Sequence, residues 1–383
     1  MANPTADEDK KGTVIMMQSV KGGVGKTTAG LAFAMALARK NSLLSPRRKN
    51  LINPKVCFID LDLQGSNTRM LLGMTPDNNG VPIKLKDAFD QKTINDHLRE
   101  HHHWKSEIHL ADMRIEFPVY PYENINNASF TRQSYAKKID YLDLFLASSD
   151  IQDKKPFMKG DSIIDPLSNI SYRYGFFRFM DAIADAGYDY VVLDMPVGFE
   201  GLCNWVYTYF LTSDAHFKDI AKCDGDLREY KQRFVLVSST HPSSFLMNIE
   251  WYFNWLLDAP QHLRVMPHTG MDKAMHDINY CFLLNDVFNE NIRTDYIIVK
   301  NIFDETVKRK ADSELKLLRQ PDIFPIKSAI LLNMGPLALL TDEYMAYKSD
   351  SSLANLEPYY SIASHKLGSQ IDLEIIRLID SLI

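Results

Sequence analysis

The 383-residue sequence has few cysteines and no apolar run near the roughly 18 residues that a membrane-spanning helix needs. Its four cysteines are scattered, and no two form a C-x-x-C pair, which argues against a disulfide framework or a zinc site. Such thiols are typical of the reducing cytosol. Residues 1–11 are polar and carry acids where a secretory signal would carry bases, so we expect a disordered tail. We therefore expect a cytoplasmic protein.

The sequence also lacks an excess of positive charge. The net charge of −6 gives no overall attraction to nucleic acid or to anionic membranes. One local run of bases could bind DNA without sequence preference, or it could be a solvated helix end and loop. It consists of Arg39, Lys40, Arg47, Arg48, Lys49 and Lys55. With 45% hydrophobic and 11% aromatic residues, the chain can bury a substantial core, as a globular protein does.

Short apolar runs alternate with helix-forming segments along the chain. Strands are predicted at 12–20, 55–61, 189–194, 233–239 and 295–303, and helices from Lys26 onward and at 175–186, 244–257 and 370–382. This order predicts an α/β fold with a mostly parallel sheet and helices on both faces. No internal repeat is present, so we expect one domain over residues 12–383.

Two polar stretches interrupt the alternation, at 75–172 and 212–231. They are predicted to be insertions on the sheet scaffold, where specificity for a partner is often located. We expect a protein partner to bind through residues 75–172. The final helix, 370–382, has mixed charges on its polar face, which favours a packed helix over a membrane anchor.

The glycine-rich stretch QSVKGGVGKTTAG, residues 18–30, joins the first predicted strand to the first predicted helix. In a P-loop, backbone N–H groups of such a turn surround phosphates, a lysine neutralises the β/γ oxygens and a Ser/Thr hydroxyl binds Mg²⁺. Lys26 and Thr27 have the right positions for these roles, although Val20 replaces the first glycine of the usual motif. The predicted ATP-binding residues are Gly22, Gly23, Val24, Gly25, Lys26, Thr27 and Thr28.

Carboxylates follow two of the predicted strands. Asp194 ends the strand DYVVLD and has the position of a Walker B acid, which would hold Mg²⁺ through water. Asp60 lies at the end of the strand predicted at 55–61, and Asp62 directly follows it. An aspartate at a strand end can also be a turn former or a helix cap.

Together, KGGVGKTT with Lys21, FIDLDLQGSN and YDYVVLDMPVG resemble the ParA/MinD group of deviant Walker A P-loop ATPases. The resemblance is strongest over 12–73 and 186–202. It implies that Lys21 reaches the ATP phosphates of a partner subunit, so that ATP closes a homodimer. It also implies that Asp62 orients the attacking water, with Asp60 as the supporting strand residue.

By the same resemblance, Gly198 lies in a second switch near the γ-phosphate and Asn301 binds the adenine. The sequence departs from the family where Leu63 replaces a frequent proline and where MPVG, residues 195–198, replaces a double proline. Neither departure removes a charged or ligating group. They place the chain on a divergent branch.

Two functions remain open from the sequence. The first is a Mg²⁺- and ATP-dependent switch whose output is the positioning or segregation of DNA or of a protein assembly. The second is an ATP-dependent enzyme acting on a substrate, as a kinase or as a ligase of a related cofactor-synthesis fold. A ligase would need a substrate pocket with its own acid and base groups, and the sequence identifies none.

Overall fold

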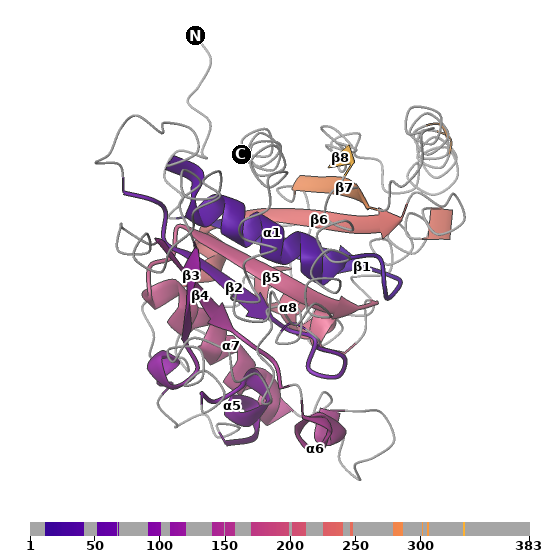
Figure 1. The fold of residues 1–383 in the computed structure, drawn as a ribbon. Coiled ribbons are helices and arrows are strands. Elements are labelled where there is room, and N and C mark those ends of the chain that lie inside the picture. The colour runs from indigo at the N-terminus through magenta and orange to yellow at the C-terminus, as the bar shows by residue number, and fades with distance from the viewer. Residues whose placement is uncertain are drawn as a thin grey trace, which may run out of the picture.

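The computed structural model describes the part of the chain that contains the sheet and its nearest helices. The described residues are 12–41, 52–66, 68, 91–100, 108–119, 140–148, 150–157, 170–198, 201–211, 225–239, 246–247, 279–285, 301, 305 and 332–333. Within them lies one eight-stranded sheet with the strand order β3-β4-β2-β5-β1-β6-β7-β8 (Figure 1).

Every neighbouring pair in this sheet is parallel except β3 and β4, which are antiparallel. The strands are β1 (Thr13–Ser19), β2 (Val56–Asp60), β3 (Ile115–Val119), β4 (Asp140–Phe145), β5 (Tyr190–Val197), β6 (Lys231–Ser239), β7 (Asn279–Asn285) and β8 (Leu332–Asn333). The central strand β1 is buried along its whole length, as its sequence TVIMMQS suggests.

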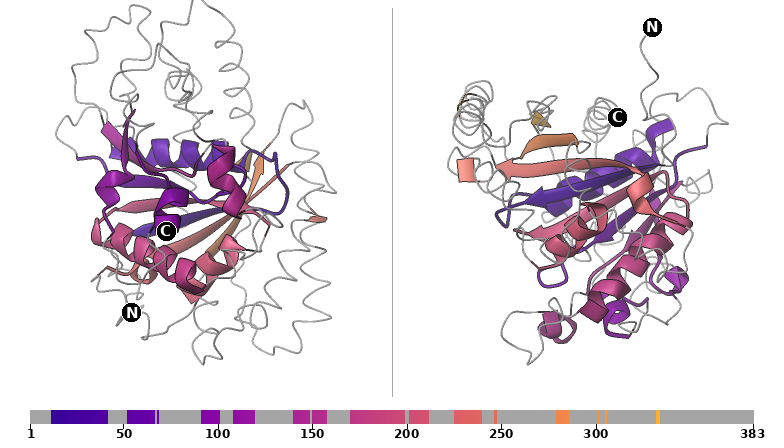
Figure 2. Two further views of the ribbon diagram at one scale, coloured as in Figure 1. Left: turned by 90° about the horizontal axis from the view of Figure 1, so that it is seen from below. Right: turned by 180° about the vertical axis from the view of Figure 1, so that it is seen from behind.

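Helices cover both faces of the sheet (Figures 1 and 2). Helix α1 (Lys26–Ala38) packs on one face, where Gly30 lies against Met17 and Phe58. Helices α7 (Ile170–Asp185) and α8 (Leu202–Leu211) contribute aromatic residues to a core on the other face, together with Val14 and Met16. Alternate residues of β1 therefore face the two helical layers. The predicted fold class is confirmed.

The shorter elements are α5 (Ile94–Glu100), α6 (Ile151–Lys154) and the 3₁₀ turns η2 (Leu110–Asp112), η5 (Lys155–Phe157) and η7 (Leu227–Glu229). In the part of the chain that the structure describes, no helix is both long and apolar enough to cross a membrane.

The expectation that 75–172 is an irregular insertion was wrong for its described parts. This stretch contains α5, α6, η2 and η5, the first turn of α7, and the strands β3 and β4. Strand β4 pairs in parallel with β2, and its residues Leu142, Leu144 and Phe145 are fully buried. Strand β4 is therefore part of the sheet, and its buried side chains are part of the core.

Two other expectations need correction. Residues 225–231 are not a surface loop, because Leu227 and Tyr230 are buried and Lys231 begins β6. Asn301 is helical and exposed, whereas the sequence predicted a strand at 295–303. The parallel strand that flanks β6 on the side away from β1 is β7 instead. The helices predicted at 244–257 and 370–382 and the tail at 1–11 fall outside the described residues, apart from 246–247, which are helical.

Candidate functional site

The glycine-rich loop runs from the end of β1 to the start of α1. Gly23 and Gly25 have φ angles of 77° and 82°, a left-handed conformation that residues with a Cβ adopt only at a cost. Gly25 is the N-cap residue of α1 and offers no side-chain cap to the first turn. The N–H groups at this helix end, together with the helix dipole, form a site that favours an anion.

Lys26 and Thr27 meet Asp194 directly beside this helix end. The Lys26 ammonium pairs with Oδ1 of Asp194, and the Thr27 hydroxyl donates a hydrogen bond of 2.6 Å to Oδ2. Lys26 is only 5% exposed and Asp194 is fully buried. Burial raises the pKa of the Asp194 carboxyl, while the contacts with Lys26 and Thr27 oppose that rise. The sequence predicted that these three residues lie close together, and in the structure they meet at the carboxyl ends of β1 and β5.

Asp60 lies beside Asp194 in the parallel register of β2 and β5. It is fully buried, and it accepts hydrogen bonds from the Ser66 hydroxyl and from the backbone N–H of Asp62, the latter at 3.0 Å. Burial, together with the neighbouring Asp194 carboxylate, raises the pKa of Asp60 to about 7. Asp60 therefore anchors the start of the turn that follows β2.

Asp62 begins that turn and is half-buried. Its Oδ1 accepts a hydrogen bond of 2.8 Å from the N–H of Gly65, and its carbonyl accepts one of 3.0 Å from the N–H of Ser66. Asp62 is thus a turn former in this structure. A water-orienting role stays a prediction, and one carboxylate oxygen, Oδ2, has no hydrogen bond assigned to it within the described residues.

Lys21 differs from Lys26 in its surroundings, although both belong to the same loop. The Lys21 side chain is exposed, and no hydrogen bond or ion pair is recorded for it within the described residues. Val24 and Lys26 are buried, whereas Gly22, Gly23, Gly25, Thr27 and Thr28 are open to solvent in full or in part. Lys21 is therefore accessible to a ligand or to another molecule.

The segment after β5 returns to the start of the glycine-rich loop. Gly198 has a φ of 85°, and its N–H donates to the carbonyl of Ser19 at 2.9 Å. The buried Gln18 side chain donates to the carbonyls of Gly198 and Pro196. Cys203 lies nearby, with its thiol 3.4 Å from the Gly198 carbonyl. Gln18 thus links the glycine-rich loop to the segment at Gly198.

Sequence reasoning missed Gln18, Cys203 and Tyr207, whose hydroxyl also contacts Gln18 at 3.4 Å. A single amide within the apolar run VIMMQS was the available signal, because a buried amide must find hydrogen-bonding partners. Burial raises the pKa of the Cys203 thiol to about 12, so this group is a neutral donor. The neighbours of Asn301 lie outside the described residues, and its adenine role stays a prediction.

The oxygen atoms of Thr27 and Asp194 are ligands of the kind that Mg²⁺ takes. Among the described residues, no group of three or more His, Cys, Asp or Glu side chains could hold a metal ion by itself. A cation at this site would therefore share its coordination between these two residues, phosphate oxygens and water.

Comparison with known proteins gives a family and a set of similar folds. The AAA domain family model matches residues 12–214, more than half of the chain. No curated protein matches the sequence.

Three solved structures are similar at low identity. They are pNOB8 ParA (TM-score 0.48, 16% identity, covering 97% of this chain and 99% of that one), MinD of the Aquifex aeolicus MinC:MinD cell division complex (0.39, 18%, 97% and 96%) and Cyanothece apo McdA (0.40, 12%, 94% and 99%). The family assignment rests on the sequence match, which spans the glycine-rich loop, Asp62 and Asp194. The chain belongs to the AAA domain family.

Proposed function

We propose that this protein is a Mg²⁺-dependent ATPase that dimerises on binding ATP and acts as a nucleotide switch, positioning or segregating DNA or a protein assembly. One observation carries the proposal. Lys26, Thr27 and Asp194 converge at the N-terminus of α1, while Lys21 stands exposed on the same loop.

Within one subunit, the loop N–H groups and Lys26 would hold the phosphates of ATP. Lys26 already lies at the phosphate end of α1, where its ammonium pairs with Asp194. Triphosphate oxygens compete for the same ammonium, so binding would exchange a carboxylate partner for a phosphate partner. Mg²⁺, when bound, supplies charge neutralisation at the phosphates, and the Thr27 hydroxyl and the Asp194 carboxylate are the groups that would hold it.

The exposed Lys21 supports a dimer. Lys26 would already neutralise the phosphates of its own subunit, and Lys21 has no hydrogen bond or ion pair within the part of the chain that the structure describes. In a two-fold dimer it would reach the phosphates of the other subunit's ATP, which would make assembly depend on nucleotide. Asp62, in the turn that follows β2, would orient the water that attacks the γ-phosphate.

The test combines ATP turnover with the molar mass in solution. Phosphate release and light scattering are measured with Mg²⁺ and ATP or a non-hydrolysable analogue. The proteins are the wild type, Lys21→Ala and the control Lys55→Ala. Lys55 is an exposed lysine next to the amino end of β2, at the opposite edge of the sheet from the site.

We expect nucleotide-dependent dimers in the wild type and in the control, and monomers in Lys21→Ala. A wild-type protein that neither releases phosphate nor changes mass contradicts the proposal. Repeating the turnover assay with duplex DNA, lipid vesicles or cell extract identifies the class of stimulating partner.

A further inference from the structure

The turn that carries Asp62 is bonded to a distant part of the chain. We define the Asp62 turn as residues 62–66. The Asn95 amide donates to the carbonyl of Leu63 at 3.1 Å, and the Lys154 ammonium donates to the carbonyl of Ser66 at 3.0 Å. In the opposite direction, the Gln64 amide donates to the carbonyl of Phe157. Residues of α5, α6 and η5 therefore contact the turn at three points.

Asn95 and Lys154 are both buried, with exposed fractions of 0% and 9%. Burying an amide or an ammonium is unfavourable unless its hydrogen bonds are made. Asn95 satisfies its remaining atoms, because its Oδ1 accepts from the N–H of Ser148 at 2.9 Å and its Nδ2 also lies 3.4 Å from the carbonyl of Asp153. A residue that only filled space at these positions would be apolar. The presence of hydrogen-bond donors at these two buried positions indicates that their bonds help to hold the turn.

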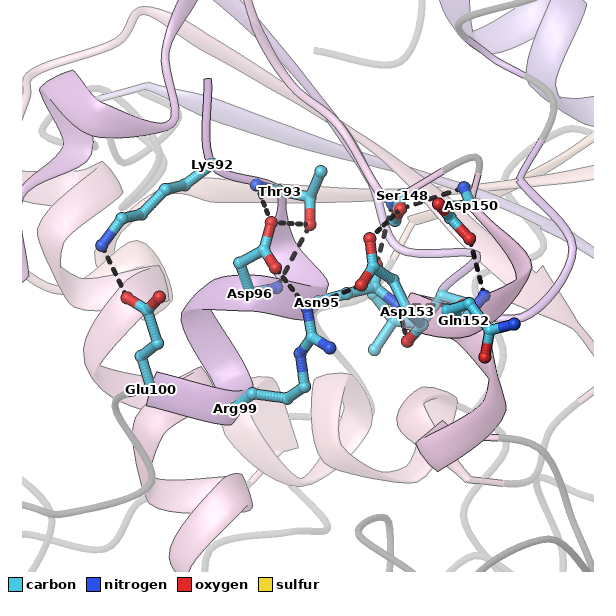
Figure 3. A network of polar contacts seen from close by, with 11 residues as sticks. Lys92, Thr93, Asn95, Asp96, Arg99, Glu100, Ser148, Asp150, Gln152 and Asp153 are labelled. Carbon is cyan, nitrogen blue, oxygen red and sulfur yellow. Dashed lines mark hydrogen bonds and ion pairs between the residues drawn. The ribbon is translucent and has the colours of Figure 1, made fainter. Parts of the chain in front are cut away.

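A polar network links α5, which carries Asn95, to α6, which carries Lys154 (Figure 3). Arg99 on α5 bonds Asp96 one turn earlier and reaches Asp153 on α6 at 2.8 Å. The Ser148 hydroxyl, after β4, donates to the same Asp153 at 2.8 Å. A single half-exposed ion pair contributes little, but linked pairs fix geometry. Asn95 and Lys154 therefore lie on two helices that this network links to each other.

The contacts within the Asp62 turn set its shape, and Asp62 and Ser66 at its two ends donate hydrogen bonds to Asp60. The bonds to Leu63 and Ser66 fix where the rest of the turn lies relative to the sheet. We propose that Asn95 and Lys154 are positioning residues that hold the Asp62 turn in place for ATP hydrolysis. This inference rests on the proposed ATPase function and adds two residues to it.

The test uses variants that change a donor and keep the size of the side chain. Asn95→Asp retains an acceptor for the N–H of Ser148 but loses the donor to Leu63. Lys154→Met removes the ammonium, and Lys154→Arg restores a donor. Lys92→Met is the matched control, because Lys92 lies two residues before α5 and is exposed in an ion pair with Glu100.

We expect kcat to fall about tenfold in Asn95→Asp and Lys154→Met, because a misplaced catalytic group lowers the rate of the chemical step. The KM for ATP and the nucleotide-dependent mass should stay within about twofold of the wild type, since no phosphate contact changes. Lys154→Arg should recover most of the rate, and Lys92→Met should match the wild type. A general loss of structure would instead change KM and mass together.

Hydrogen exchange of the backbone amides of residues 62–66 supplies a readout that does not depend on hydrolysis. Exchange should be faster in Lys154→Met than in Lys154→Arg or the control. Wild-type kcat and unchanged exchange in both Asn95→Asp and Lys154→Met would overturn the inference. If Asn95→Asp does not fold, Lys154→Met and Lys154→Arg, compared with the wild type, decide the question. A wild-type protein without ATPase activity overturns the proposed function instead, and the exchange data then decide the positioning of the turn.

Discussion

Replacing Lys26 with methionine should do two separable things, because this lysine both neutralises a buried carboxylate and binds phosphate. Methionine has a similar volume, so little of the effect should come from a cavity. The Lys26–Asp194 pair is almost completely buried. Removing one partner of a buried ion pair costs about 3–5 kcal/mol in the free energy of unfolding. We expect a loss of this size near neutral pH, together with loss of ATP binding.

The loss should depend on pH in a defined direction. Burial already raises the pKa of Asp194, and removing Lys26 removes the contact that most opposes this rise. A carboxyl group whose pKa is raised on folding destabilises the protein as pH rises from the unfolded value, about 4, through the folded value. The deficit of Lys26→Met relative to the wild type should therefore be smaller at about pH 5 than at about pH 8.

The double variant Lys26→Met/Asp194→Asn separates stability from binding. It removes both buried charges, so most of the lost stability should return, while ATP binding should not. Urea denaturation at the two pH values gives the free energies, and titration of a fluorescent ATP analogue gives the affinities. Normal affinity in Lys26→Met would refute the site assignment. A deficit that is independent of pH and persists in the double variant would refute the ion-pair reasoning.

Four further predictions follow from the same structure. Lys21→Ala should bind ATP as a monomer and not hydrolyse it, as light scattering and phosphate release would show; an ATP-dependent dimer would contradict the role across the interface. Asp62→Ala should form the ATP dimer but hydrolyse ATP ~10²-fold more slowly, which corresponds to an activation barrier higher by about 3 kcal/mol. Size-exclusion chromatography with Mg²⁺ and ATP would reveal a persistent dimer. A monomer, or turnover at the wild-type rate, would show that Asp62 is only a turn former. Burial raises the pKa of Asp181 to about 6, so its ionised form destabilises the protein as pH rises from about 4 to about 6. Asp181→Asn should therefore add up to about 3 kcal/mol of stability near pH 7 but little near pH 4. Equal effects in urea denaturation at both pH values would contradict this. Replacing 121–138 with a Gly/Ser linker should preserve nucleotide affinity and remove a partner captured by the intact protein; capture of the same partner by both proteins would contradict the expected binding region.

Much of the sheet could be predicted because its central strands are continuously apolar. Strands β1, β2, β5 and β6 were all found within one or two residues at their N-terminal ends. Strands β3 and β4 were missed because polar residues and a proline interrupt them. Pro118 is tolerated in β3 because that strand lies at the edge of the sheet. Asp143 fits the interior of β4 because the Tyr188 hydroxyl donates to it at 2.7 Å.

The candidate site was predictable to the extent that chain order determines it. Carboxyl ends of parallel strands share one edge of a sheet, so Lys26, Thr27 and Asp194 had to lie close together. The contacts of Asn95 and Lys154 were not predictable. They join segments about 30 and about 90 residues apart in the chain, through side chains whose types alone give no pairing. Only the packing of α5 and α6 beside the turn reveals them.

This packing changes how the region 75–172 is to be tested as a partner-binding segment. Replacing 98–135 with a linker, the experiment that the sequence suggests, would remove Leu98 and Phe117, which are fully buried. That variant would lose stability and would disturb α5, which bonds the Asp62 turn through Asn95. Loss of a partner would then be inseparable from loss of catalysis. The narrower replacement of 121–138 leaves β3, β4, Asn95 and Lys154 in place. If this variant no longer binds a partner, the cause is the loss of the contacts that residues 121–138 themselves make with that partner.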